Sequence, residues 1–274
     1  MINLSYGNAP TAAEGHGHHS ESINGDTLTA ALPLDYSNFR LSRNLVWRDP
    51  DTDFQFALSQ PSTDPALWNE YVDGAKRSYQ NRGVECALDL DALQSGDDTV
   101  LFFTALDRAG RIVGGARSVG PLQSPDESHA VVEWSGQEGQ QRVWDMIADR
   151  LPFGVLEIKT AWKLDCPGKN RELTEVLART GFHMTALLDV QFFMATSASY
   201  LVDKWRTSGG VVAPVPETPY PDDRFNTKMM WWDSRNFAQF ATPDQASKIH
   251  NECTRLLHAF YRETQPAPST RSDS

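Results

Sequence analysis

Two runs of apolar, strand-forming residues with a polar turn between them predict a β-hairpin in the first half of the chain. The strands are expected at residues 100–106 and 111–117, and the turn at 107–110. Gly110 suits the turn because glycine takes a positive φ without steric cost. The second strand contains the pair Gly114 and Gly115. Paired glycines in a strand indicate a bulge, or a place where another backbone or a ligand approaches closely.

The pattern predicts further elements on both sides of the hairpin. Apolar residues at helical spacing predict a helix from 65 to 81, with Asp64 as its N-cap and Gly83 after its end. A helix at 171–179 is expected to end at Gly181. The other expected elements are two short strands within 44–58, strands at 130–134, 155–164, 182–195, 211–215 and 225–232, and helices at 140–151, 197–206 and 243–264.

This order of elements predicts an α+β fold, with a central mixed or antiparallel sheet flanked by helices. The early strands form a hairpin, which argues against an all-parallel, doubly wound sheet. We expect one domain over residues 42–240 and a C-terminal helix at 241–264. Residues 1–41 and 265–274 are polar and aperiodic, and are expected to be disordered tails.

Composition narrows the function classes. The chain has 274 residues and a formal net charge of −11, which disfavours binding to nucleic acid or anionic lipid. No apolar run approaches the roughly 18 residues of a membrane span, and no secretory signal is visible. The three cysteines do not suggest a disulfide framework, so a cytoplasmic location is expected. The histidines at 16, 18 and 19 fit either a metal ion or a solvated tail, and we expect no metal site.

Four segments resemble a known superfamily over about residues 68–233. They are the acidic positions Asp89, Asp91, Asp97 and Asp98, the strand end 114–117 followed by Pro121, the strand segment 156–159, and the Gly-Phe step within 177–182. Together they resemble acyltransferases with the Gcn5-related N-acetyltransferase (GNAT) fold. The closer resemblance is to acyl-homoserine-lactone synthases and long-chain N-acyl amino acid synthases.

The resemblance implies an N-acyltransferase with a GNAT-like sheet. It would move an acyl group, expected to be fatty, from a coenzyme A or acyl-carrier-protein thioester to the amine of a small acceptor. No permanently bound cofactor is implied. Thr160 stands where the synthases have an arginine, and the loop 165–170 has one glycine where acetyltransferases have more. Both departures favour a carrier-protein or long-chain donor, and they keep open the alternative of an inert GNAT-like binding module.

Acyl transfer to an amine needs a base, a polarised carbonyl and a leaving thiolate. Glu157 is the expected base or ammonium anchor, and Glu133 is its rival. The competing interpretation of Glu157 is an ion pair with Lys159 or Lys163. The cysteine at 166 is a further, weaker candidate for a nucleophile.

Binding residues are expected on neighbouring segments. Arg117 is expected to hold a carboxylate or phosphate, or else to pair with Asp89 or Asp91. Asp89, Asp91 and Trp162 are the other expected substrate-binding residues. Gly168, Lys169 and Asn170 precede a helix, where an anion can bind. The apolar residues at 192–194 and 229–232 line an acyl-chain tunnel or belong to the core.

Overall fold

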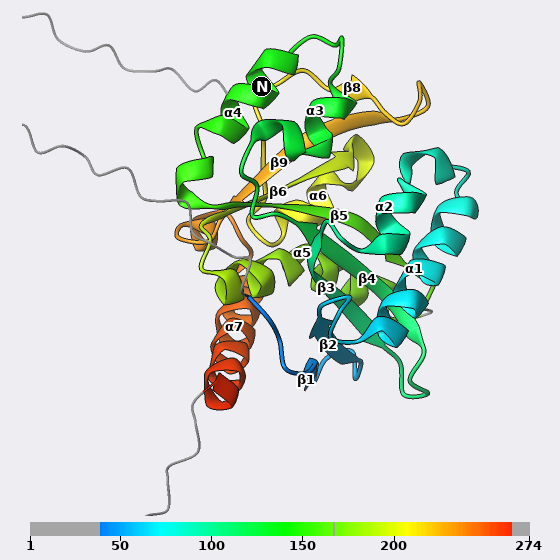
Figure 1. The fold of residues 1–274 in the computed structure, drawn as a ribbon, viewed down its shortest axis with the longest axis vertical. Coiled ribbons are helices and arrows are strands. Elements are labelled where there is room, and N and C mark those ends of the chain that lie inside the picture. The colour runs from blue at the N-terminus through cyan, green and yellow to red at the C-terminus, as the bar shows by residue number, and fades with distance from the viewer. Residues whose placement is uncertain (1–38, 167, 265–274) are drawn as a thin grey trace, which may run out of the picture. The chain divides into compact units, whose positions relative to one another are not determined.

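The computed structural model of the chain describes residues 39–166 and 168–264. Within them, the strands form one nine-stranded sheet in the order β1-β2-β3-β4-β5-β6-β9-β7, with β8 paired to β9 outside this path (Figure 1). β5 and β6 are parallel, and the other pairs are antiparallel. The strands are Leu45–Arg48 (β1), Gln55–Ser59 (β2), Thr99–Leu106 (β3), Ile112–Val119 (β4), Val155–Lys163 (β5), Phe192–Ala198 (β6), Val211–Val212 (β7), Thr218–Pro219 (β8) and Asn226–Asp233 (β9).

Helices cover both faces of this sheet, which confirms the expected α+β fold (Figure 1). α5 and α7 lie on one face, whereas α1 and the pair α3 and α4 lie on the other. The helices are Pro65–Gln80 (α1), Leu90–Ser95 (α2), His129–Glu133 (α3), Gln140–Ala148 (α4), Asn170–Leu188 (α5), Val202–Arg206 (α6) and Pro243–Thr264 (α7).

Local chemistry explains the elements that were predicted well. Asp64 caps α1 by accepting a hydrogen bond from Leu67 N at 2.9 Å. The hairpin turn is held by Asp107, whose Oδ1 accepts from Ala109 N at 2.9 Å and Arg111 N at 3.0 Å. Gly110 in that turn has a φ of +78°. These contacts lie within a few residues of sequence, so the pattern alone was sufficient to predict them.

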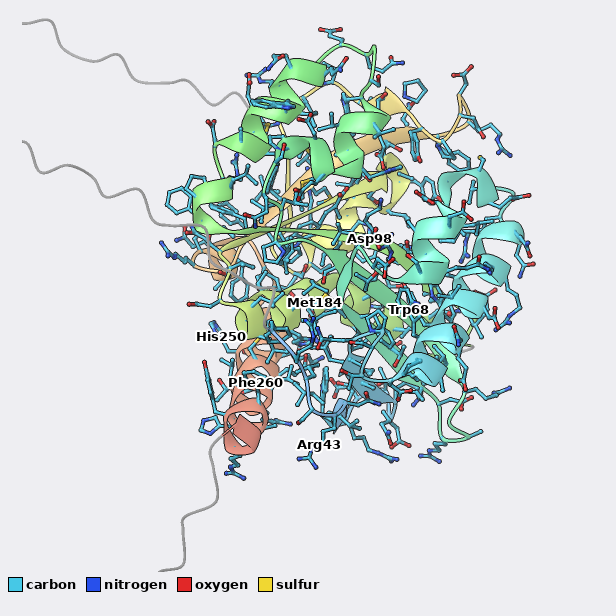
Figure 2. All side chains as sticks on the ribbon, viewed as in Figure 1. Arg43, Trp68, Asp98, Met184, His250 and Phe260 are labelled. Carbon is cyan, nitrogen blue, oxygen red and sulfur yellow. The ribbon has the colours of Figure 1, made fainter. Side chains whose placement is uncertain are left out.

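The two faces of the sheet belong to different clusters. Successive strand residues point to opposite faces, and β3 shows this clearly. Phe103 joins the large core under α5, which includes Met184, whereas Phe102 packs with Trp68 and Tyr71 of α1. Met184 and Trp68 are marked in Figure 2. A third cluster lies under α3 and α4 and contains Trp134, Val143, Ile147, Met194 and Met229. The middle of β5 therefore lies between the α1 cluster and the α3–α4 cluster.

Residues 130–134 form part of a helix, so the strand expected there is wrong. Ser128 caps α3 by accepting a hydrogen bond from Ala130 N at 3.2 Å. Ala130 and Trp134, four residues apart, are both fully buried on one side of the turn. Packing of that side outweighs the strand preference of the two valines between them.

Residues 182–188 are helical and only residues 192–195 are in a strand, so the long strand expected at 182–195 is also wrong. α5 continues through Gly181 to Leu188, and β6 begins at Phe192. Gly181 does not end the helix. Its missing side chain lets the Phe193 ring pack against α5, since an added Cβ would lie 2.4 Å from that ring. Burial of both sides of α5 outweighs the helix-ending tendency of glycine.

The helix expected at 197–206 begins later than predicted, since β6 extends to Ala198 and α6 spans Val202–Arg206. The strand expected at 211–215 is reduced to β7, and the short elements α2 and β8 were not predicted. The expected tails 1–41 and 265–274 lie almost wholly outside the described residues, as does the histidine cluster. α7 contributes Ile249 and Leu256 to the large core under α5. No helix in the described part of the chain has the length and apolar character needed to cross a membrane.

Candidate active site

The parallel strands β5 and β6 separate in the middle of the sheet. They pair over three residues only, and the last pair is Glu157 with Met194. Beyond it β5 keeps β4 as its neighbour, and β6 keeps β9. In the described part of the sheet, the facing edges of β5 and β6 past Glu157 therefore have no strand partner. Unpaired strand edges present backbone N–H and C=O groups that an extended ligand can bind.

Glu157 lies where the strands separate and is 1% exposed. Its Oε2 accepts a hydrogen bond from His129 N at 2.9 Å, at the start of α3. Burial raises the pKa of this carboxyl, while nearby Lys159 and hydrogen bonds from residues 128–130 oppose the rise. Glu157 thus ties β5 to α3, and part of its hydrogen-bonding capacity is used for that purpose.

Glu133 projects from the end of α3 and is 7% exposed. Its Oε1 accepts a hydrogen bond from Thr196 Oγ1 at 2.9 Å, from the part of β6 beyond the last pair with β5. Its Oε2 is buried and has no hydrogen-bond partner. Burial raises the pKa of this carboxyl to about 8, and the charge of Glu157 adds to the rise. A buried carboxyl with one unpaired oxygen and a pKa near neutrality fits a general base.

Two further polar side chains border Glu133. His129 Nε2 lies 2.7 Å from Tyr220 Oη and 3.8 Å from Glu133 Oε1. Burial, followed by the charge of Lys159, lowers the pKa of His129 to about 4. Since the imidazole is then neutral at neutral pH, it can accept the hydrogen of the Tyr220 hydroxyl.

Lys159 lies on the same face of β5 as Glu157. It is half-buried, and burial lowers the pKa of its ammonium group. Its charge acts on Glu157, Glu133 and Arg117, yet among the described residues no carboxylate lies within 4 Å of its nitrogen. It is therefore a cation beside the two carboxyls that remains able to receive an anionic group.

Arg117 is 2% exposed and stabilises a bulge in β5. Its Nη1 donates to Asp98 Oδ1 at 2.6 Å and to Thr99 Oγ1 at 2.9 Å, and its Nε donates to Thr160 Oγ1 at 3.3 Å. Thr160 has a φ of +51°, and the β4–β5 register shifts beside it. A non-glycine residue in this conformation is strained and persists because its neighbours hold it there. Arg117 pairs with Asp98, and not with Asp89 or Asp91 as the alternative interpretation expected.

Among the described residues, Asp89, Asp91 and Trp162 make no hydrogen bond to Glu157, although the charge of Asp89 acts on His129. Asp89 is the exposed N-cap of α2, with Oδ1 accepting from Ala92 N, and Asp91 is exposed in the next turn. Trp162 is buried against α1, where an added Cβ on Gly74 would lie 2.1 Å from its ring. An added Cβ on Gly115 would lie 2.5 Å from the carbonyl oxygen of Phe103 and 2.8 Å from the Tyr71 ring, and one on Gly114 would lie 2.9 Å from the carbonyl oxygen of Trp162. Neighbouring backbone and the Tyr71 ring therefore fill the space that the paired glycines provide.

The loop before α5 uses its own polar groups internally. Asn170 Oδ1 accepts from Lys163 Nζ at 3.0 Å and from Cys166 N at 2.9 Å. Lys169 Nζ donates to the carbonyl of Thr52. Gly168 is exposed and has nothing within 4 Å of an added Cβ. Burial raises the pKa of the Cys166 thiol, which is the opposite of what an activated nucleophile requires.

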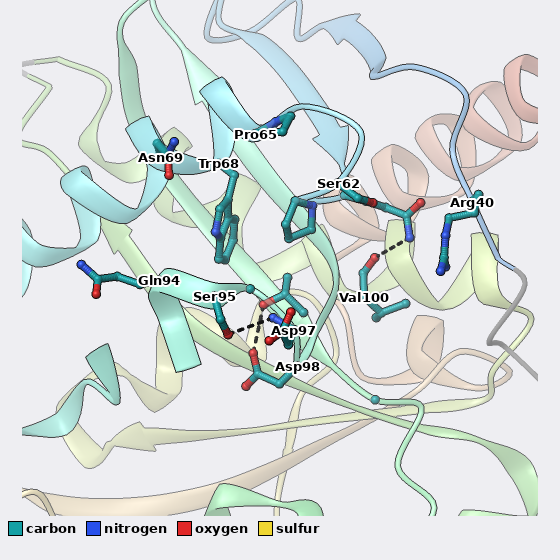
Figure 3. A pocket seen from close by; sticks show the side chains of 15 residues that line it. Arg40, Ser62, Pro65, Trp68, Asn69, Gln94, Ser95, Asp97, Asp98 and Val100 are labelled. Carbon is teal, nitrogen blue, oxygen red and sulfur yellow. Dashed lines mark hydrogen bonds between the residues drawn. The ribbon is translucent and has the colours of Figure 1, made fainter. Parts of the chain in front are cut away.

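A pocket of about 550 Å³ lies at the far end of α2 (Figure 3). Trp68 and Asn69 of α1 line it, together with Asp97, Asp98 and Arg40. It shares Asp98 with the Arg117 ion pair but includes neither Glu133 nor Glu157. Its wall includes Trp68, whose Nε1 is buried without a hydrogen-bond partner, but it contains no buried carboxyl that could take up a proton. We therefore place the candidate chemistry at Glu133 and Glu157. The residues expected to line an acyl tunnel, including Met194, Met229 and Trp231, pack in the core cluster under α3 and α4.

Sequence reasoning missed three neighbours of Glu133. His129 stands four residues before Glu133, which is the spacing of side chains on one helix face, but the segment was interpreted as a strand. Lys159 stands two residues after Glu157, so strand alternation could have placed them on one face. Tyr220 is remote in sequence, and no local signal pointed to it.

Comparison with known proteins places the chain among bacterial relatives. The uncharacterized protein Rv1356c of Mycobacterium tuberculosis (strain ATCC 25618 / H37Rv) is 48% identical over 233 residues, which cover 84% of this chain and 88% of that protein. The uncharacterized protein Mb1391c of Mycobacterium bovis matches to the same extent. The chain belongs to the family of these mycobacterial proteins. No family model matches it.

Solved structures similar to this one include several acyltransferases. FeeM, an N-acyl amino acid synthase from uncultured soil microbes, is 9% identical with a TM-score of 0.48 and covers 74% of this chain and 95% of its own. The CoA-dependent acyl-homoserine lactone synthase BjaI, solved with SAM and isopentyl-CoA, is 14% identical with a TM-score of 0.45 and covers 72% and 88%. A probable acetyltransferase from Staphylococcus epidermidis ATCC 12228 is 9% identical with a TM-score of 0.43 and covers 65% and 98%. These proteins are of the kinds that the sequence resembles. Sequence identities and TM-scores this low give no information about what this chain binds.

Proposed function

We propose that this protein is an N-acyltransferase that moves an acyl group from a coenzyme A or carrier-protein thioester to the amine of a small acceptor. The observation that carries the proposal is Glu133 Oε2, a buried and unpaired carboxyl oxygen beside the point where β5 and β6 separate. Acyl transfer to an amine needs a group of this kind, because an ammonium must lose a proton before its nitrogen can attack.

The charges around Glu133 support an amine acceptor. An ammonium group placed at Oε2 would favour the ionised form of Glu133, which could then take a proton from it. Lys159 offers a cation on the same side of the site. An acceptor that carries both an amine and a carboxylate, such as an amino acid, would therefore satisfy both groups. Glu157 supports the site by holding the start of α3 in place.

The gap between β5 and β6 supports a thioester donor with an extended amide-containing arm. Phosphopantetheine, the arm shared by coenzyme A and acyl carrier protein, has two amides that can bind strand edges in the manner of an added strand. At the far end of β5, Lys163 lies within electrostatic range of Arg82 and of Lys204. Lys163 also bonds Asn170, the first residue of the 19-residue helix α5. This end of the gap suits a phosphate.

The proposed step balances with one proton released to solvent. The ionised form of Glu133 takes one proton from the acceptor's ammonium group, and the amine nitrogen attacks the thioester carbon. The C–N bond forms, the C–S bond breaks, and the nitrogen loses a second proton, which the leaving thiolate takes up. Glu133 then releases its proton to solvent. The products are an amide and a free thiol.

A panel of acyl thioesters and small amines, with thiol release as the readout, tests this function. We expect turnover for at least one pair with wild-type protein, and a loss of about 10²- to 10⁴-fold in Glu133→Gln. Glu138→Gln, at an exposed position five residues away, is the matched control and should retain wild-type turnover. Thioester binding without thiol release across the whole panel would contradict the proposal and support the alternative of an inert binding module. Equal turnover in wild type and Glu133→Gln would remove Glu133 from the mechanism.

A further inference from the structure

The buried carboxyls are covered by the turn between β8 and β9, residues 220–225, called the strap below. Its first residue, Tyr220, contacts α3 through the 2.7 Å bond between its Oη and His129 Nε2. Burial raises the pKa of Tyr220 to about 12, and the charge of Glu133 is the next cause. The Tyr220 phenol therefore lies close to Glu133, and Glu133 itself is buried.

The other end of the strap contacts the α1 side. Arg224 Nη2 donates to the carbonyl of Gly83, just after α1, at 2.8 Å. Arg224 is also held within the strap, because its Nε donates to Asp222 Oδ1 at 2.8 Å and its Nη2 to Asp222 Oδ2 at 2.7 Å. The strap thus bridges α1 and α3 across the middle of β5. In Figure 1 the tip of the β8–β9 hairpin reaches toward the side of α1 and α2.

We propose that the strap is a gate, through which the amine acceptor reaches Glu133 when the Tyr220–His129 and Arg224–Gly83 contacts open together. Glu133 must meet its substrate, yet α3, β5 and the strap enclose it. Of these, α3 and β5 are joined by the buried Glu157 contact and by packing of α3 into the core. The strap is held by an arginine that is 61% exposed and by one hydrogen bond at a half-buried tyrosine. Contacts at the solvent edge open at lower free energy than buried ones.

The inference rests on the proposed function in one respect, that Glu133 is the group an acceptor must reach. Its first test needs no substrate. Native-state hydrogen exchange of the α3 amides measures how often the strap moves away from α3. The His129 N–H is suited to this measurement because it donates to Glu157 beneath the strap. We expect Arg224→Ala and Tyr220→Phe each to speed this exchange about two- to tenfold, the range for loss of one hydrogen bond.

Two matched controls are available. Arg206 is 56% exposed and pairs with Asp203 within one helical turn, so Arg206→Ala removes a similar arginine that bridges no elements. Tyr200 is 69% exposed and lies outside the strap, so Tyr200→Phe is the control for Tyr220→Phe. In both control variants, the α3 amides should exchange at the wild-type rate. Wild-type exchange in Arg224→Ala and Tyr220→Phe, or equal acceleration in the controls, would overturn the gate.

A second test uses the acceptor identified in the thioester panel. Arg224→Ala should change kcat/KM for the acceptor and leave kcat/KM for the thioester within twofold of wild type. Equal changes for both substrates would overturn the assignment of this entrance to the acceptor. If no thioester is turned over but exchange still depends on Arg224, the proposed function fails while the strap remains a gate to the buried carboxyls.

Discussion

Glu133 illustrates at the scale of one residue how a reactive group lowers stability. Its folded pKa is about 8 against a usual value of 4.5, because the ionised form is poorly solvated where it lies. The folded state keeps this proton up to about pH 8, whereas the unfolded chain releases it near pH 4.5. Between these values the folded state binds more protons than the unfolded state, so stability falls as pH rises.

Glu133→Gln should remove this dependence. We expect the variant to gain stability over wild type as pH rises from 5 to 8, on the order of 1–3 kcal/mol in total. Urea unfolding at several pH values measures the difference, with Glu138→Gln as the exposed control. A variant whose stability changes with pH in parallel with wild type would show that Glu133 titrates normally. If Glu133→Gln gains stability and loses turnover, Glu133 contributes to the reaction at the expense of the stability of the fold.

At the scale of elements, α5 and β6 are joined through a glycine. Gly181 lies in the middle of α5, and the Phe193 ring of β6 occupies the space a side chain would take. That ring stacks on Trp232 of β9 at 4.7 Å and meets Phe182 edge-on at 4.9 Å. The contact sets how closely α5 approaches the sheet on the face opposite the candidate site.

Gly181→Ala should destabilise the protein by about 1–3 kcal/mol, because an added methyl overpacks the core. The higher helix propensity of alanine offsets part of this loss, by up to about 1 kcal/mol. Phe193→Leu in the same chain should recover part of the stability, and a double-mutant cycle measures the coupling. Strict additivity of the two changes would show that the methyl and the ring do not meet.

At the scale of the whole molecule, a buried ion network joins distant parts of the chain. Arg179 of α5 pairs with Glu252 of α7 at 2.8 Å and with Asp49 after β1 at 3.3 Å, and His183 bonds the same Glu252 at 2.8 Å. Burial alone would raise the pKa of Glu252, but hydrogen bonds from His183 and Arg179 lower it to about 2. This carboxylate therefore stabilises the fold above pH 4.5, and the contribution is lost as pH falls toward 2.

Glu252→Ala should cost about 3–5 kcal/mol at pH 7, because it leaves Arg179 buried without its main partner. Replacing both residues, as Arg179→Met with Glu252→Leu, should cost less than Glu252→Ala alone, because the buried guanidinium is removed together with its main partner. Asp49 then loses its contact with Arg179 but keeps its hydrogen bonds from Thr52 N and Oγ1. Urea unfolding at pH 7 compares the variants. A double variant as unstable as the single one would show that packing, and not the unpaired charge, carries the effect.

Elements that are determined by residues close together in the sequence could be predicted without a structure. The hairpin of β3 and β4, the Asp64 cap of α1, the strand β5 and the helix α7 follow from turn chemistry, capping and periodicity within short segments. The α+β class follows from their order. Glu157 was named because its strand resembles the one that carries a functional glutamate in the synthases, and Glu133 was named as its rival. Their roles stay a prediction.

Features that depend on which surfaces meet were decided only by the tertiary structure. Residues 130–134 form a helix because Ala130 and Trp134 are buried together, and α5 passes Gly181 because Phe193 packs there. Glu133 and His129 of α3, Lys159 of β5 and Tyr220 after β8 come from three separate segments, and no local pattern predicts that these segments converge. Their pKa shifts arise from burial and from one another's charge. Both depend on distances through space, and a sequence pattern records only distances along the chain.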